Sequence, residues 1–465
     1  MPEIHSPSSV SAGTTRRYAL MLAPMVLLAA ALAVLLLNGS HQRLRMRLDI
    51  PGGARAASSR PRLTLHFAQA VAPASVEPRL SLAPPVPFTL TWHGDEVQIV
   101  PGEALQPGAT YTVSLTAGVT APDGQPLQGA AKWRFTTRPL RLLFLALPAG
   151  ENAGTSLRVA PLDGTGSRPL SASGQPVQDF GVSPDGSEVI YSVAEEPGTT
   201  NFWRVRPGER GWSRLTDGEG VVYSAPRWSP AGDIIAYEER RVLSIAGEAQ
   251  LSNPHVALMR PDGTPAGLVY GSAEEAGHSP IWSPDGTRLA LYDANTETVA
   301  IFNFTGTPLR VAAGSSGVGS WSPNGRKLVT TAILPSGQGV RQVLRVHDLE
   351  VGTETVIEEP VGQMADPAWS PDGEWIAYAY QPPLGLGRGS EIALLRPDDS
   401  QRIALVSSPE AILSTPVWAP AGDWLAFSKL AITDSGARPE LWVIRRDGSA
   451  LRRIAASAYL PQWLP

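Results

Sequence analysis

Trp369-Ser370-Pro371-Asp372-Gly373 is one copy of a phrase that decides the fold of this 465-residue chain. The clear copies, each including the two residues before the tryptophan, begin at Pro226, Pro280, Gly319, Pro367 and Pro416. A degenerate copy runs from Val182 to Gly186, and a shortened copy runs from Pro461 to Pro465. A repeat with a period of roughly 45 residues predicts an array of similar small units.

Each unit has the composition of four short strands. The tryptophan strand is followed by a Ser-Pro-Asp-Gly turn, in which proline presets the first turn position and glycine accepts a positive φ. An apolar strand such as Leu289-Ala290-Leu291-Tyr292 comes next, and a third strand ends near an Asp-Gly turn such as Asp262-Gly263. A fourth strand leads to the next unit. Four strands per repeat predict the blade of a β-propeller, with the tryptophan packed between neighbouring blades.

The two ends of the repeat region complete one blade between them. Leu142-Leu143-Phe144-Leu145 reads as a second strand without a tryptophan strand before it, whereas the Trp463 strand reads as a first strand with nothing after it. The sequence therefore predicts seven blades, in a ring that closes by pairing these two segments and leaves no open sheet edge.

The aspartates of the phrase are predicted to be turn residues. Ala231 and Ala421 replace the aspartate in two copies, and Asn324 replaces it in a third. A metal or catalytic role repeated at every turn does not fit these losses. Asp185, Asp285 and Asp372 are thus expected to stabilise their turns.

A smaller all-β domain is predicted over residues 61–138. Runs with a period of two, such as Tyr111-Thr112-Val113-Ser114-Leu115 and Trp133-Arg134-Phe135, are separated by turns such as Pro122-Asp123-Gly124. This pattern favours a β-sandwich.

Two family resemblances rest on these residues. The phrase around Trp282 and Trp369 resembles the TolB-type propeller repeat, and the likeness covers residues 141–465. Leu105, Pro107-Gly108, Tyr111 and the closing Phe135-Thr136-Thr137 resemble the bacterial Ig-like family. The resemblances imply a binding scaffold outside the cytoplasm, and a spacer domain without a site of its own.

The sequence of the amino-terminal segment predicts a membrane anchor. A tail, residues 1–17, precedes 20 residues without charge, 18–37, which as a helix would span a bilayer core of about 30 Å. Residues 38–60 read as a linker. A cleaved signal peptide is the alternative, and arginines on both sides leave the orientation open. The expected location is the cell membrane, with the later domains periplasmic or extracellular.

Composition narrows the chemistry. The net charge is −5, which gives no drive toward nucleic acid, and no cysteine is present, which excludes disulfides and thiolate sites. The seven histidines show no metal-binding spacing, and neither a Gly-x-Ser-x-Gly phrase nor a phosphate-binding loop occurs. No catalytic residue, metal or cofactor is predicted.

Long loops on one face of the ring form the candidate binding site. The loops run over 194–201, 238–254, 335–341, 381–390 and 431–440. The candidate contact residues are Glu238, Glu239, Arg240, Arg241, Glu274, Glu275, His278, Asp366 and Arg388. The acidic balance of this face favours a basic peptide or a cation. The predicted function is noncatalytic binding of a protein, peptide or envelope polymer. The alternatives are an enzyme of lyase or glycosidase type with a site in the central channel, and a structural or sensor ectodomain.

Overall fold

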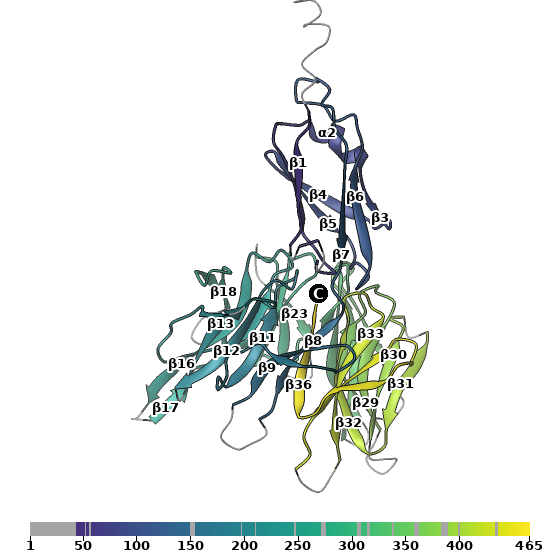
Figure 1. Cartoon of the computed structure of the whole chain (residues 1–465). Coiled ribbons are helices and arrows are strands. Elements are labelled where there is room, and N and C mark those ends of the chain that lie inside the picture. Colours follow the sequence, from purple (N-terminus) through teal and green to yellow (C-terminus); the bar gives the residue numbers. More distant parts are fainter. Residues whose placement is uncertain are drawn as a thin grey trace, which may run out of the picture.

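The computed structural model describes residues 43–465, apart from short stretches within that range. The stretches left out are 52, 55–56, 149–153, 197, 210, 246–247, 271–275, 305–307, 314–316, 337–338, 358–361, 383–388, 399 and 433–435. In the described part the regular secondary structure is almost entirely β-strand, with a sandwich standing on a larger array of sheets (Figure 1). The predicted span 18–37 lies outside the described residues. No helix within them is long and apolar enough to cross a bilayer.

The sandwich is built from two sheets and a short helical segment. One sheet has the order β1 (Met46–Asp49), β2 (Leu63–Phe67), β5 (Glu96–Pro101), β4 (Phe88–His93). The other has the order β3 (Leu80–Ala83), β6 (Thr110–Leu115), β7 (Ala131–Thr136). Between β2 and β3 lie the helix α2 (Pro73–Val76) and the 3-10 turn Glu77–Arg79. Leu63, Leu65 and Phe67 all face the core because alternate residues of a strand share one side.

The sandwich begins earlier than the sequence predicted. Residues 46–49, assigned above to the linker, form strand β1 and pair with β2 from Met46–Phe67 to Asp49–Thr64. Charged residues at Arg47 and Asp49 alternate with apolar ones, and this short run carries too few apolar residues to stand out as a strand.

The second domain is a β-propeller whose sheets each have four main strands. The first sheet has the order β10 (Arg168–Pro169), β9 (Ser156–Pro161), β8 (Arg141–Ala146), β36 (Ala458–Leu464). The second has the order β11 (Val177–Val182), β12 (Val189–Glu196), β13 (Thr199–Val205), β14 (Trp212–Arg214). The third has the order β15 (Val221–Trp228), β16 (Ile235–Ile245), β18 (His255–Met259), β19 (Pro265–Tyr270). An extra strand, β17 (Glu248–Leu251), pairs with the far end of β16. One parallel pair, Thr200–Val222, joins the second sheet to the third.

The remaining sheets follow the same order. They are β20 (Gly277–Trp282)–β21 (Leu289–Asp293)–β22 (Thr298–Phe302)–β23 (Leu309–Ala312); β24 (Ser320–Trp321)–β25 (Lys327–Ser336)–β26 (Gly339–Asp348)–β27 (Thr353–Ile357); β28 (Gln363–Trp369)–β29 (Ile376–Gln381)–β30 (Ser390–Leu395)–β31 (Arg402–Ser408); and β32 (Ala411–Trp418)–β33 (Trp424–Ala431)–β34 (Glu440–Arg445)–β35 (Arg452–Ala455).

The two ends of the repeat region pair as predicted. Strand β36 lies antiparallel to β8, with Trp463 opposite Leu142 and Ala458 opposite Ala146. Trp463 is also buried against the last sheet, in a cluster with Trp424 and Val443. The closing sheet therefore joins the end of the array to its beginning.

The repeated phrase ties four of the sheets to the one before. In four copies the tryptophan indole N–H donates to the carbonyl of the residue before the preceding tryptophan. These bonds run from Trp282 to Arg227, Trp321 to Ile281, Trp418 to Ala368 and Trp463 to Val417, at 3.1, 3.4, 3.0 and 3.0 Å. The indole thus satisfies a polar group and fills space between sheets, which explains why tryptophan recurs at this position.

The turns also touch one another around the ring. A methyl group on a turn glycine would lie 3.5–3.7 Å from the proline of the preceding turn, for Gly232 on Pro184, Gly286 on Pro230, Gly373 on Pro323 and Gly422 on Pro371. Pro465 takes the same place against Gly186, at 3.2 Å. Within the turns, Asp372 accepts from the Ser370 hydroxyl at 2.6 Å and from the Glu374 N–H at 3.0 Å. Asp185 and Asp285 make the equivalent bonds, so these aspartates stabilise turns.

Candidate functional site

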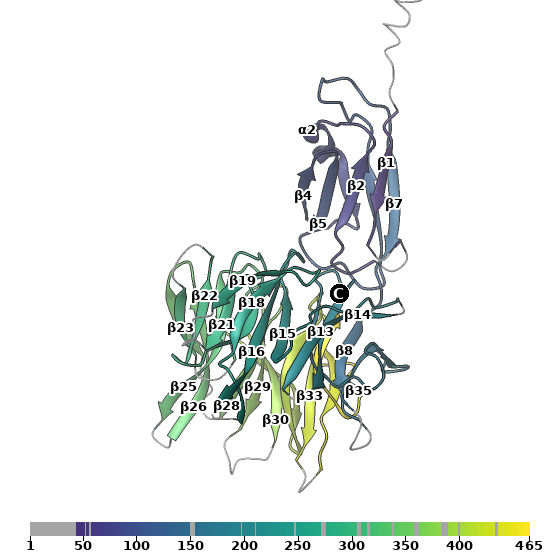
Figure 2. The same ribbon diagram turned by 90° about the vertical axis from the view of Figure 1, so that its left-hand side faces the viewer.

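The propeller has two different faces. The "turn face" carries the Ser-Pro turns, and the "hairpin face" is the opposite side, where the second strand of each sheet ends. Figures 1 and 2 show the sandwich above the turn face. Its contacts there are specific: Arg62 Nη2 donates to the Pro230 carbonyl at 2.5 Å, and Arg138 donates to the carbonyls of Asp185 and Pro465 at 2.6 and 2.7 Å. The sandwich therefore covers part of the turn face and none of the hairpin face.

Two hairpins, β16–β17 and β25–β26, extend from the hairpin face, and the ends of β32 and β33 that lie away from their Pro420 turn reach the same side (Figures 1 and 2). Their outer parts carry exposed apolar side chains. These are Leu243, Leu251, Ile333, Val340, Ile412 and Leu430, with Ile432 just beyond β33. Val340 is 68% exposed, and exposed apolar groups gathered on one side of a protein are typical of an interaction surface. Sequence analysis placed Leu243, Leu251 and Val340 in long loops, whereas they lie on strands β16, β17 and β26, and it did not single out these apolar residues.

Four of the predicted site residues are neighbours on strand β16. Glu238 lies between two sheets, where its Oε2 accepts from the Ser224 hydroxyl at 3.2 Å and its Oε1 accepts from the Ser279 N–H at 2.7 Å. Both of its oxygens are thus engaged within the propeller. Glu238 consequently ties the inner strands β15 and β20 together.

The other three β16 residues differ in their partners. Glu239 is paired with Arg241 at 3.1 Å, with the glutamate largely buried and the arginine 70% exposed. Arg240 is half-buried and forms no ion pair or hydrogen bond through its side chain in the described part of the chain. Its positive charge acts on His278. Arg240 and Arg241 are therefore the two β16 residues best placed to meet a ligand.

His278 and Asp366 lie on β20 and β28, the innermost strands of their sheets. The His278 ring approaches the Ser279 hydroxyl at 3.0 Å and Tyr292 at 5.1 Å between ring centres. Burial lowers the pKa of His278; the nearby Glu238 opposes this shift, and Arg240 adds to it. Asp366 Oδ2 accepts from the Thr415 N–H of the next sheet at 2.9 Å, which is the same kind of tie that Glu238 makes.

The structure brings Glu238, Arg240 and His278 together, while Asp366 belongs to a different pair of sheets. Glu274, Glu275 and Arg388 lie outside the described residues.

Sequence reasoning missed two residues of the Glu238 cluster. Asp179 lies on β11 with its carboxylate 3.8 Å from Arg227 on β15, and the side chains are 19% and 32% exposed. Burial raises the pKa of Asp179; Arg227 opposes the shift and Glu238 adds to it. Arg227 also donates to the carbonyls of Phe180 and Pro226 at 3.3 and 3.0 Å. The cluster thus spans three consecutive inner strands, β11, β15 and β20.

A cavity of about 230 Å³ adjoins this cluster on the turn side. Gly181, Arg227, Ile281 and Gln462 contribute to its lining, and they all lie on inner strands. Within the described residues no group of three or more His, Asp or Glu side chains is arranged to hold a metal ion. The arrangement can recognise charged groups through Arg227, Arg240 and the carboxylates.

The fold defines a class of all-β proteins in which a β-sandwich domain precedes a β-propeller. Residues 47–137 match the bacterial Ig-like domain family, so the sandwich is a bacterial Ig-like domain, as its residues predicted. No curated protein matches the chain in sequence.

Among solved structures, TolB from Acinetobacter baumannii is similar, with 14% identity, coverage of 83% of each chain and a TM-score of 0.44. The periplasmic gluconolactonase PpgL of Pseudomonas aeruginosa has 14% identity, coverage of 70% of this chain and 98% of its own, and a TM-score of 0.46. A prolyl endopeptidase structure has 10% identity, coverage of 83% and 51%, and a TM-score of 0.49. TolB, which the repeats resemble, is thus among the similar folds. None of these similarities is high enough to assign an activity.

Proposed function

We propose that this chain is a membrane-anchored scaffold with a seven-bladed propeller outside the cytoplasm, which binds a protein or peptide through its hairpin face without catalysis. In this proposal the sheets described above serve as seven blades, with the two sheets joined at Thr200–Val222 counted separately and with β36 and β8 in the closing one. Residues 18–37 supply the anchor in this proposal.

One observation carries the proposal: the Ig-like domain is bonded to the turn face through Arg62 and Arg138, while no described residue of that domain covers the hairpin face, which carries exposed apolar side chains. Apolar side chains at a contact supply most of the free energy of association, and charged groups around them set orientation. Arg240 and Arg241 adjoin the β16–β17 hairpin and supply such charges.

The test measures retention of envelope proteins and peptides on the immobilised full-length chain. Replacing Leu243 and Leu251 by serine removes two exposed apolar side chains of the β16–β17 hairpin, and we expect retention of the bound partner to fall about tenfold or more, as for loss of a central contact. The matched control replaces Val351 and Val356, which are exposed elsewhere, by serine. Equal retention by both variants, or measured turnover of a small molecule, would contradict the proposal.

An enzyme with a channel site remains a second candidate because of one observation. Asp179 has a raised pKa and lies near the carboxylate Glu238 and the guanidinium Arg227. Two carboxylates with different environments can divide the roles of acid and base. A glycosidase and lyase substrate panel, read with Asp179→Asn as the inactive control, tests this alternative; absence of turnover that depends on Asp179 eliminates it.

A further inference from the structure

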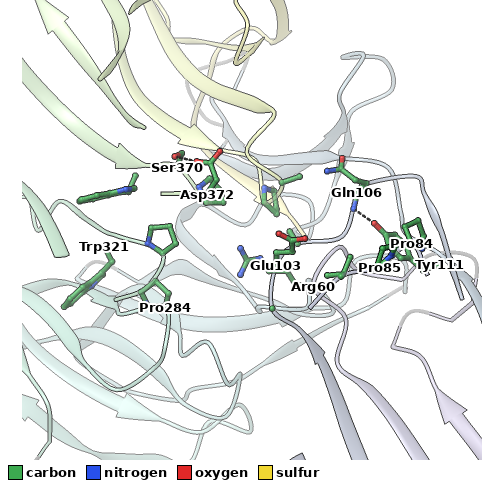
Figure 3. Close-up of a pocket in the computed structure, with 18 residues that line it drawn as sticks. Arg60, Pro84, Pro85, Glu103, Gln106, Tyr111, Pro284, Trp321, Ser370 and Asp372 are labelled. Atoms are coloured by element: carbon green, nitrogen blue, oxygen red, sulfur yellow. Dashed lines mark hydrogen bonds between the residues drawn. The ribbon is translucent and has the colours of Figure 1, made fainter. Parts of the chain in front are cut away.

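A cleft of about 530 Å³ lies between the Ig-like domain and the turn face. The domain is hydrogen-bonded to the turn face at Pro230, Asp185 and Pro465, which belong to three consecutive sheets. On the other side it stands away from the turns of the remaining sheets, and the cleft opens there. Figure 3 shows its two walls, with Pro284 and Trp321 on one side and Pro84, Pro85 and Tyr111 on the other.

Prolines form much of both walls. The propeller contributes one proline from each of four successive turns, and the Ig-like domain contributes two adjacent ones. They are Pro284, Pro323, Pro371, Pro420, Pro84 and Pro85. Because proline carries no N–H donor, these walls offer rigid apolar surface with little hydrogen-bonding capacity. Such walls suit an aliphatic or aromatic side chain lying flat between them.

Two opposite charges from the Ig-like domain enter the cleft without partners. Arg60 and Glu103 both line it, and among the described residues neither side chain forms an ion pair or a hydrogen bond. Asp372, which lines the cleft from the propeller, differs because it is bonded to Ser370 and Arg446. The cleft thus presents one free guanidinium and one free carboxylate beside apolar walls.

We propose that this cleft is a second binding site, for a peptide segment that carries a carboxylate beside an apolar side chain. The Arg60 guanidinium is suited to a bidentate pair with the carboxylate. Glu103 accepts N–H bonds from the peptide backbone, and the proline walls hold the apolar side chain. A volume of this size is typical of a site for a short segment and not for a folded domain. A polyphosphate fits worse, because Glu103 and Asp372 would repel it.

The experiment uses the purified full-length chain and capped pentapeptides that have phenylalanine or leucine next to a central Asp, each with an Asn counterpart. We expect the Asp peptides to bind and their Asn counterparts to bind at least tenfold more weakly, since a hydrogen bond to a charged group is worth about that factor. Arg60→Gln should abolish this preference without changing the melting temperature, because the Arg60 side chain has no hydrogen-bond or ion-pair partner among the described residues. Arg134→Gln, an exposed arginine on β7, is the matched control.

The outcomes separate this site from the hairpin face. The Leu243 and Leu251 serine variants should leave peptide affinity unchanged. Equal binding of Asp and Asn peptides, or an Asp preference that survives Arg60→Gln, would overturn the proposal. Displacement of the peptides by millimolar inorganic phosphate alone would reveal a general anion site and would likewise overturn the peptide assignment.

Discussion

Replacing Trp463 by alanine tests whether the propeller depends on its closing strand. Trp463 lies on β36, is only 6% exposed, and donates its indole N–H to the Val417 carbonyl at 3.0 Å. Truncating a buried aromatic residue to alanine costs about 3–5 kcal/mol. The free energy of unfolding of a domain is typically about 5–15 kcal/mol. The change should therefore remove a large share of propeller stability.

The assay is urea unfolding followed by circular dichroism, with calorimetry to separate the two domains. Trp212→Ala is the matched control: this indole also donates to a carbonyl, that of Leu170, but the residue is 48% exposed on the outer strand β14. We expect a clearly smaller loss there. Trp463→Phe should cost about 1 kcal/mol for the lost hydrogen bond plus a small packing loss.

Deletion of residues 458–465 extends the same test. It removes the whole of β36, with the buried residues Ala458 and Leu464, and exposes one edge of β8. We expect the cooperative propeller transition to disappear while that of the Ig-like domain remains. If the truncated chain melts like the intact one, or if Trp463→Ala costs no more than Trp212→Ala, the closure argument is wrong.

Three further changes have defined outcomes. Gly181→Ala should lower the free energy of unfolding by about 1–3 kcal/mol in urea titrations, because the added Cβ would lie 2.1 Å from the Pro226 carbonyl oxygen. Gly102→Ala, whose Cβ would lie 3.4 Å from its nearest atom, should cost less, and equal losses would contradict this reasoning. Burial raises the pKa of Asp179, so the contribution of this carboxyl group to stability is present at low pH and is lost as the pH rises above about 4. Asp179→Asn should flatten that part of a profile of unfolding free energy against pH, and an unchanged profile would refute the assigned role of Asp179. Burial lowers the pKa of His347, against the opposing effect of Glu354, so the contribution of this imidazole to stability is present above about pH 6.5 and is lost as the pH falls. His347→Gln should remove that acid sensitivity, which melting temperatures measured from pH 7 to pH 5 would reveal.

Much of the fold is readable from local sequence because each repeat carries its own turn chemistry. Pro371-Asp372-Gly373 specifies a turn by residue type, and the unpaired segments around Leu142 and Trp463 predict their own pairing. What local sequence could not indicate is the bend of the inner strands. Ala225, Ser279, Asp366, Thr415 and Leu460 all have a positive φ although none is glycine, and each stands three residues before its tryptophan. Such conformations are held by the surrounding fold.

The candidate site was less predictable from local sequence, because its contacts are also set by the surrounding fold. Asp179 and Arg227 meet although 48 residues separate them, because the ring places successive inner strands side by side. No spacing within one repeat encodes this contact. Glu238 looked like a surface residue since it follows Tyr237 in a polar run, yet its oxygens are used between sheets.

The place of β8 in the closing sheet has a mechanical consequence. The chain enters the propeller from the Ig-like domain at Arg141, and β8 is hydrogen-bonded along both sides, to β9 and to β36. A pull transmitted through the Ig-like domain would therefore act along the strand and load both rows of bonds together in shear. Unzipping them one at a time would require a pull from the side, so the junction is built to bear tension.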